Sequence, residues 1–211
     1  MKGIVKPQDI EKRSFEIITA ELGGRTFPAG VGEVVKRVIH TSADFDYADN
    51  LCFSPDAVEQ GKAALLAGAT VVTDTNMALA GISKPALAEV GARAVCLMAE
   101  EDVAREAKAR GVTRAAVAVE HAAKMDGALI FAVGNAPTAL LRLHELIAAG
   151  AVQPALVIGV PVGFVNVVES KELFVGGETP HIIARGRKGG SNVAAAIVNA
   201  LLYQIVTREG F

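Results

Sequence analysis

The chain is poor in the residue types on which several classes of protein depend. Its 211 residues contain no Trp, only 5% aromatic residues, and two cysteines, Cys52 and Cys96, far apart in the sequence. Two such cysteines make neither a disulfide framework nor a metal-ligand cluster, so we expect both to be reduced packing residues. The formal net charge of −2 provides no general basic surface, which argues against nucleic-acid binding.

Long apolar stretches are also missing. Residues 1–6 contain no apolar run of signal-peptide length, and the longest apolar region, 155–168, is interrupted by Pro, Gly and Asn and is too short to span a bilayer. We therefore expect a cytoplasmic protein without a membrane partner. The apolar residues make up 51% of the chain and are mainly small or aliphatic, which suits helices packed closely on a parallel sheet.

The order of the predicted elements indicates an α/β fold. The first third reads as helical, and from residue 70 onward short apolar runs alternate with helical stretches. The predicted helices are 10–22 (opened by Pro7), 28–40, 55–68, 84–90, 102–110, 113–124, 137–149 and 192–206, and the predicted strands are 70–73, 94–98, 128–133, 155–160 and 182–184. Alternation of this kind implies right-handed crossovers and a mostly parallel sheet. No linker or repeat interrupts the chain, so we expect a single domain over 1–211, with Rossmann-like layering and a helical N-terminal region.

Four segments that follow predicted strands carry Gly, Pro or polar residues: 74–76, 134–137, 161–163 and 185–187. Ligands of open parallel sheets bind beyond the carboxyl ends of the strands, so a site is expected where these loops converge. Each loop taken alone is also compatible with a simple turn. The candidate ligand contacts in this region, chosen by position, are Asn76, Asn135, Arg187 and Ser191.

His40 is the main candidate for proton transfer. The spacing Arg37-x-x-His40 places both side chains on neighbouring rows of one helix, and histidine titrates near neutral pH. The alternative is a helix-terminal histidine beside a solvated arginine. Asp44 or Asp46 is a candidate for orienting His40, and both are also compatible with a solvated turn.

The remaining candidates are less specific. Ser14 lies on the apolar stripe of the first helix, where a hydroxyl either bonds back to the backbone or faces a ligand in a cleft. His121, His144 and His181 are weaker candidates than His40, and His121 and His144, which lie within predicted helices, read as surface or edge residues. No histidine pair or cysteine has the spacing of a metal site, so we expect no protein-bound metal.

Two glycine-containing segments lead into helices, 134–138 and 189–192. Helix N-termini offer free N–H groups and partial positive charge, which suit anions, and Arg185, Arg187 and Lys188 add charge before the second helix. Neither segment is a dinucleotide fingerprint or a P-loop. The residues favour an enzyme that holds a polycarboxylate and moves a proton with His40, over a nucleotide-dependent Rossmann-like enzyme or a non-catalytic carrier.

Four blocks in order, 37–40, 134–140, 159–171 and 185–191, carry a resemblance to a known family. The chain resembles the precorrin-8X and cobalt-precorrin-8 methylmutases of cobalamin (vitamin B12) biosynthesis over nearly its whole length. The resemblance implies an isomerase that moves a methyl group from C-11 to C-12 of the corrin ring and gives hydrogenobyrinate or cobyrinate. The alternative functions are a non-catalytic tetrapyrrole-binding carrier and, less favoured, a nucleotide-dependent Rossmann-like enzyme.

The resemblance also implies roles for particular residues. His40 corresponds to the catalytic acid/base, and Ser14 and Arg37 correspond to substrate-binding positions. The family needs no cofactor, since any cobalt is carried by the tetrapyrrole substrate, and its members are homodimers. Segments 43–47, 73–77 and 80–84 are more similar to the cobalt-using branch.

Overall fold

The computed structural model describes residues 9–207, and its centre is a six-stranded sheet in the order β1-β6-β5-β4-β2-β3. The strands are β1 (Leu51–Phe53), β2 (Thr70–Thr73), β3 (Arg93–Val95), β4 (Leu129–Val133), β5 (Leu156–Gly159) and β6 (His181–Ala184). All neighbouring pairs are parallel except β1 with β6. The predicted mostly parallel α/β fold is confirmed. The expectations for residues 1–6 and for a helix opening at Pro7 lie outside the described residues.

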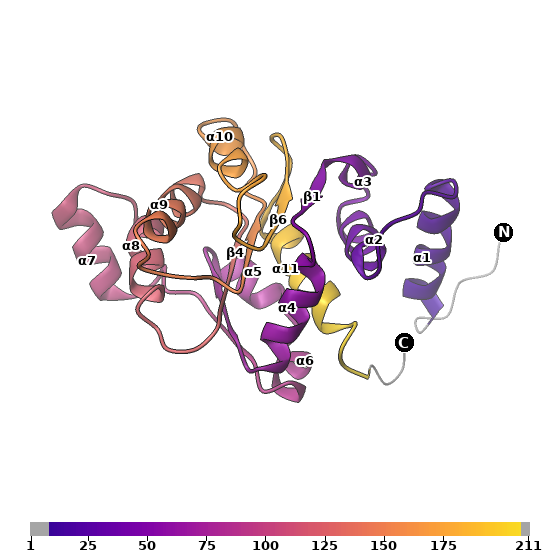
Figure 1. The fold of residues 1–211 in the computed structure, drawn as a ribbon, viewed down its shortest axis with the longest axis horizontal. Coiled ribbons are helices and arrows are strands. Elements are labelled where there is room, and N and C mark those ends of the chain that lie inside the picture. The colour runs from indigo at the N-terminus through magenta and orange to yellow at the C-terminus, as the bar shows by residue number, and fades with distance from the viewer. Residues whose placement is uncertain (1–8, 208–211) are drawn as a thin grey trace.

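Helices cover both faces of the sheet (Figure 1). One face packs on α2 (Val31–Ser42), α4 (Ala57–Leu66), α5 (Asn76–Gly81), α6 (Lys84–Glu89) and α11 (Ser191–Leu202). The other face is covered by α8 (Arg114–Ala122), α9 (Pro137–Ala148) and α10 (Val167–Glu172), with α7 (Glu101–Arg110) outside α8. Two further helices, α1 (Ile10–Glu21) and α3 (Tyr47–Asn50), lie beside α2.

Strand β4 shows how the sheet serves two cores. Ile130 and Ala132 join the cluster that contains α11, while Leu129, Phe131 and Val133 join the cluster that contains α9. Because successive strand residues point to opposite faces, a strand buried on both sides reads as a continuous apolar run. That run is why β4 and β5 were predictable from the sequence.

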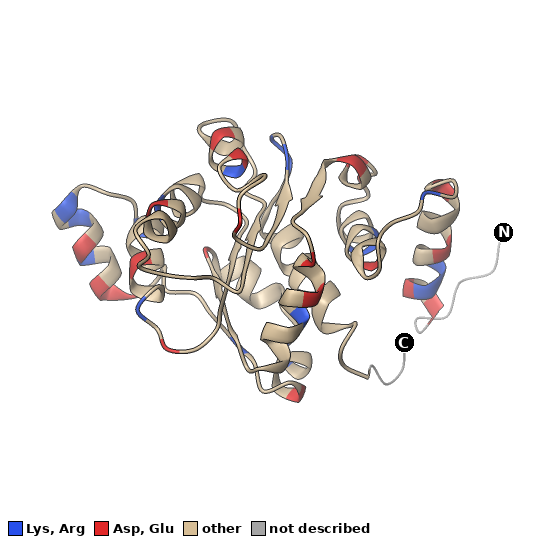
Figure 2. Cartoon of the chain, in the orientation of Figure 1, with Lys and Arg blue, Asp and Glu red and all other residues tan. Residues whose placement is uncertain are grey.

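The central helix α11 carries no charge, and the helices at the two ends of the molecule carry both signs. Figure 2 shows no charged residue on α11, whereas α1 and α7, at the two ends of the molecule, carry both signs. Helix α11 is buried along most of its length and packs against α2 and α5 as well as the sheet. A helix that is apolar on all sides must be covered on all sides, so α11 occupies the centre of its layer.

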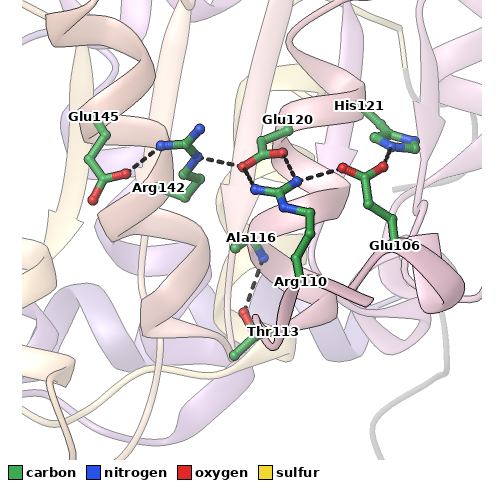
Figure 3. A network of polar contacts seen from close by, with 8 residues as sticks. All are labelled: Glu106, Arg110, Thr113, Ala116, Glu120, His121, Arg142 and Glu145. Atoms are coloured by element: carbon green, nitrogen blue, oxygen red, sulfur yellow. Dashed lines mark hydrogen bonds and ion pairs between the residues drawn. The ribbon is translucent and has the colours of Figure 1, made fainter. Parts of the chain in front are cut away.

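A chain of ion pairs holds the outer helices α7, α8 and α9 together (Figure 3). Arg110 of α7 pairs with Glu106 and with Glu120 of α8, and Glu120 also accepts a hydrogen bond from Arg142 of α9. The donation from Arg110 and then that from Arg142 lower the pKa of Glu120 to about 2. His121 lies at the same surface, 2.7 Å from the Glu106 carboxylate.

The predicted long helices are confirmed with shifted ends, but several short elements were missed. The structure has α3, α5, α10 and strand β1 where no element was predicted, and β3 has only 3 residues instead of the five expected. Elements of three to six residues contain too few periods for a reliable pattern. β1 is short because it pairs with β6 only from Leu51 to Phe53, at the edge of the sheet.

We expect Gly189→Ala to destabilise the fold by about 2–3 kcal/mol or more, the range of severe overpacking. A Cβ atom at residue 189 would lie 2.0 Å from the carbonyl oxygen of Val160, and a backbone atom cannot move away as a side chain can. Gly32→Ala is the matched control, because its Cβ would meet only the Phe27 side chain at 3.4 Å inside α2. Urea unfolding monitored by circular dichroism measures both variants. Equal stability of the two would contradict the close approach at Gly189.

Candidate active site

A groove of about 380 Å³ lies between α1 and the end of α2. Its lining is mainly apolar, with Ser14 and His40 as the two polar groups that meet in it. The residues that line it are Ile10, Arg13, Ser14, Ile17, Ile18, Glu21, Ile39, His40, Ala43 and Phe45. An apolar groove with a few converging polar groups is the usual form of a small-molecule site.

Helix α2 gives the groove a rigid wall. Val34, Val35 and Val38 are buried in the core, as the sequence predicted, and they fix the helix against α11. His40 lies in the last turn, and the helix ends at Ser42, followed by Ala43 with a left-handed φ of 54°. The imidazole is therefore carried by an element that cannot rotate without disrupting the core.

Ser14 and His40 come together across the two helices. The Oγ atom of Ser14 is 2.8 Å from Nδ1 of His40, and the ring of Phe15 lies 5.5 Å from the imidazole ring, centroid to centroid. Among the described residues, no buried side-chain nitrogen or oxygen lacks a partner. Nε2 of His40 has no partner within this part of the chain, so it reaches the open groove. Ser14 thus orients the ring and leaves Nε2 for proton exchange.

The surroundings of His40 favour its neutral form. Burial lowers the pKa of His40 below 6.5, the positive charge of Arg37 lowers it further, and the charge of Glu11 acts in the opposite direction. Burial is the largest of these causes, and the two nearby charges modify the pKa of His40 in opposite directions.

Arg37 is engaged within the protein. Its Nη2 atom donates a 2.6 Å hydrogen bond to Glu11, and its guanidinium lies 4.6 Å from the Phe15 ring and 5.0 Å from the Tyr203 ring. Arg37 is absent from the lining of the groove. It joins α1 to α2 and to the end of α11, and its expected contact with substrate stays a prediction.

One predicted anion site is already occupied by the protein itself. The carboxylate of Asp74, which follows β2, accepts hydrogen bonds of 2.9, 2.8 and 2.6 Å from the N–H groups of Gly134, Asn135 and Ala136. Burial raises the pKa of Asp74, and these N–H groups partly offset that effect. In the predicted anion-binding segment 134–138, the N–H groups of residues 134–136, just before α9, are therefore not free. A phosphate would have to displace an internal carboxylate there.

The other position-based candidates do lie at the carboxyl edge of the sheet. Asn76 and Asn135 are exposed there, on the segments that follow β2 and β4. Ser191, at the start of α11, shares a 2.7 Å hydrogen bond with Thr75. The structure brings these residues to one edge, while the groove with His40 lies between α1 and α2.

The loop after β6 carries three cations with different partners. Arg185 makes two hydrogen bonds to Glu172. Lys188 donates 2.6 Å hydrogen bonds to both Asp44 and Asp46. The two aspartates considered as partners of His40 therefore bind Lys188, and the Nδ1 partner of His40 is Ser14.

Arg187 differs from its neighbours in that loop. Within residues 9–207 it has no carboxylate partner, and its guanidinium lies 5.3 Å from the ring of Phe164. The candidate substrate contact is thus the one exposed cation of the loop that remains available for an external anion.

Sequence reasoning missed Glu11, Phe15, Asp74 and Lys171. Glu11 and Phe15 lie on the same helix as Ser14, but their meeting with α2 depends on tertiary packing. Asp74 was noted only as part of a loop, and the N–H groups that donate to it lie about sixty residues away. Lys171 had a usable signal, because a charged residue closes the apolar block 159–171.

The other histidines lie outside the groove, as expected. His121 belongs to the outer ion-pair chain, and His144 meets the ring of Phe174 edge-on. His181 is buried, with Nδ1 2.8 Å from the Thr179 carbonyl oxygen.

Within residues 9–207, no three or more His, Cys, Asp or Glu side chains are grouped so that they could hold a metal ion. No helix of this part has the length and apolar character needed to cross a membrane.

Charge substitutions beside His40 give a signed prediction. Arg37→Gln removes the positive charge that lowers the pKa of His40, so that pKa should rise, whereas Glu11→Gln should make it fall further. NMR titration of the imidazole C–H signals measures the pKa of His40 in both variants. The signal that disappears in His40→Gln is assigned to His40. A rise in both variants would mean that loosening of α1, rather than charge, controls the pKa.

Comparisons with known proteins agree with the described geometry. The sequence profile of the family described as Precorrin-8X methylmutase matches residues 9–204. The chain is 45% identical to the cobalt-precorrin-8 methylmutase of Priestia megaterium, over 93% of this chain and 88% of that protein. It is 43% identical to the precorrin-8X methylmutase of Pseudomonas aeruginosa, over 92% and 94%.

A solved structure shares the fold at similar identity. The crystal structure of precorrin-8x methyl mutase from Thermus thermophilus has a TM-score of 0.85 and 43% sequence identity, covering 92% of this chain and 94% of that one. The family profile spans almost all of the described residues, including both helices of the groove and the carboxyl-edge loops. The chain belongs to the precorrin-8X methylmutase family.

Proposed function

We propose that the protein is an isomerase that moves a methyl group from C-11 to C-12 of precorrin-8X or cobalt-precorrin-8, giving hydrogenobyrinate or cobyrinate. Family membership supports the reaction, and the observation that carries the site is a rigid histidine whose free nitrogen opens into an apolar groove. Relatives named for the cobalt and for the metal-free substrate are similarly close, at 45% and 43% identity. The cobalt substrate is our preferred one, on the sequence segments 43–47, 73–77 and 80–84.

The proposed mechanism uses His40 as acid and then as base. The His40 imidazolium donates the Nε2 proton to the macrocycle, which becomes electrophilic enough for a suprafacial 1,5-shift of the methyl group. Loss of a proton from the ring to the neutral imidazole restores conjugation, so substrate and product have the same mass. Ser14 accepts from Nδ1–H in the imidazolium and also in the neutral tautomer left after Nε2 has given up its proton, so the Nε2 lone pair is free to take a proton back. The anionic arms of the substrate favour the imidazolium at the moment it is needed.

The reaction needs no redox cofactor and no methyl donor, because the migrating methyl never leaves the substrate. We propose that the protein uses no metal of its own and that any cobalt is part of the substrate. The contribution of the protein is orientation of the ring and positioned proton transfer. A cytoplasmic location fits this proposal.

We further propose that the protein acts as a homodimer. Pockets for drug-sized ligands span roughly 300–1,000 Å³, and a tetrapyrrole with its carboxylate arms is larger than such a ligand. The groove of about 380 Å³ lies at the low end of that range. Its rim includes Ile10 and Ile17, which are 55% and 44% exposed. A second chain over this rim would bury both residues and enlarge the site.

Ile17→Glu should convert the dimer to monomers, since a carboxylate would be buried at the interface. Sedimentation velocity measures the change. Leu66→Glu is the matched control, because Leu66 is 59% exposed on α4, away from the groove, and should leave the mass unchanged. A wild-type protein that sediments as a monomer would contradict the proposal.

His40→Ala should lower kcat by about 10²–10⁴-fold, the usual contribution of positioned acid–base catalysis, while pigment binding changes little. Anaerobic incubation with cobalt-precorrin-8 and, separately, with precorrin-8X is followed by visible absorption and mass spectrometry. A spectral change at constant mass identifies the isomerase, and the better substrate identifies the branch. His121→Gln, on the opposite side of the sheet, is the control.

For the wild type, kcat/KM should fall as pH rises through the pKa of His40, which lies below 6.5, because the acid form is required.

Two results would contradict this function. A wild-type rate in His40→Ala would remove the histidine from the mechanism. Binding of both pigments without conversion would instead identify a tetrapyrrole carrier.

A further inference from the structure

Lys171 is a completely buried lysine in a place where the proposed chemistry does not need one. It lies in α10, and its Nζ atom donates hydrogen bonds of 2.9 Å to the carbonyl oxygen of Gly186 and 2.8 Å to that of Lys188. These two carbonyls flank Arg187 in the chain. Placing an ammonium group in the interior is costly, so the hydrogen bonds it makes are expected to serve a purpose.

The segment that Lys171 holds is also joined to the loop after β5. The N–H of Gly163 donates a 3.1 Å hydrogen bond to the carbonyl of Arg187, and the N–H of Gly190 donates a 2.9 Å bond to the carbonyl of Val160. Each of the peptide carbonyls of residues 186, 187 and 188 therefore accepts a hydrogen bond from outside its own loop. The backbone around Arg187 is fixed on both sides.

The side chains displayed by this fixed backbone are apolar and cationic. Phe164 and Val165 are 80% and 78% exposed, and the Arg187 guanidinium lies 5.3 Å from the centre of the Phe164 ring. Arg185 and Lys188 have carboxylate partners within the protein, so they contribute little net charge to a ligand. An apolar ring beside a free guanidinium matches a macrocycle edge that bears a carboxylate arm.

We propose that Lys171 is a positioning residue for substrate binding, which holds the backbone on both sides of Arg187 so that its guanidinium and the Phe164 ring together receive a carboxylate-bearing arm of the macrocycle. This inference rests on the proposed function. Phe164 and Arg187 are the contact residues, and Lys171 acts only through them.

Two further observations support a functional rather than a purely structural lysine. Burial lowers the pKa of Lys171 to about 8, and the charge of Glu172 opposes this effect, so the ammonium form still predominates at neutral pH. The Lys188 side chain also reaches Asp44 and Asp46, which follow His40 by four and six residues. The loop that Lys171 fixes is therefore tied to the end of the helix that carries His40.

The test is a double-mutant cycle on substrate binding and turnover. Lys171→Met removes the donors but keeps the length of the side chain, and Arg187→Gln removes the contact itself. Each should raise KM roughly tenfold, the effect of losing about one charge-assisted hydrogen bond, with kcat within about threefold of the wild type. The double variant should bind no more weakly than Arg187→Gln alone, because Lys171 acts through Arg187.

Lys62→Met is the matched control, since Lys62 is a partly buried lysine that pairs with Glu59 on α4. If Lys171→Met does not fold, Lys171→Gln, which keeps an amide donor, replaces it in the same cycle. Additive losses in the double variant, or an unchanged KM in the Lys171 variant, would overturn the role of Lys171 while wild-type conversion upheld the proposed function. A wild type that neither binds nor converts either pigment would overturn both.

Discussion

The ion pair between Arg37 and Glu11 is the interaction on which the candidate site depends. Helix α1 lies at the periphery of the molecule in Figure 1 and packs on α2, so the groove exists only while those two helices stay together. The pair is mostly shielded from solvent, and its guanidinium lies over the rings of Phe15 and Tyr203. Such shielding makes the pair stronger than an exposed one and makes loss of either partner costly. The same two charges also act on the His40 imidazole, so one contact sets both the shape and the protonation of the groove.

The fold was largely predictable because its signals are local. The valine stripe of α2 and the continuous apolar runs of β4 and β5 each follow from residues close in sequence. The short elements α3, β1, α5 and α10 were not predictable, because tertiary contacts rather than periodicity define them.

The candidate site was predictable in part, and for a different reason. His40 stood out by its chemistry and by its place on an amphipathic helix. Its contact with Ser14 joins residues 26 positions apart, and nothing in the spacing of two separate helices fixes which side chains will meet. The occupation of the α9 N-terminus by Asp74 shows the same limitation, since a motif reveals a capacity to bind an anion but not whether the chain supplies that anion itself. For the same reason, counting the Lys and Arg residues at the carboxyl edge of the sheet overestimated the positive charge available to a ligand. Most of its cations are neutralised from within.

The apolar helix α11 has a consequence for how the protein is made. It fills the centre of one layer, yet it comes after every strand of the sheet in chain order, and its partner α2 comes from the opposite end of the described chain. Contacts between such distant segments form late and slow folding. During synthesis the centre of this layer therefore stays unfilled until residues 191–202 leave the ribosome. The nascent chain would present a broad apolar surface through most of translation, a state in which chaperones are the natural protection.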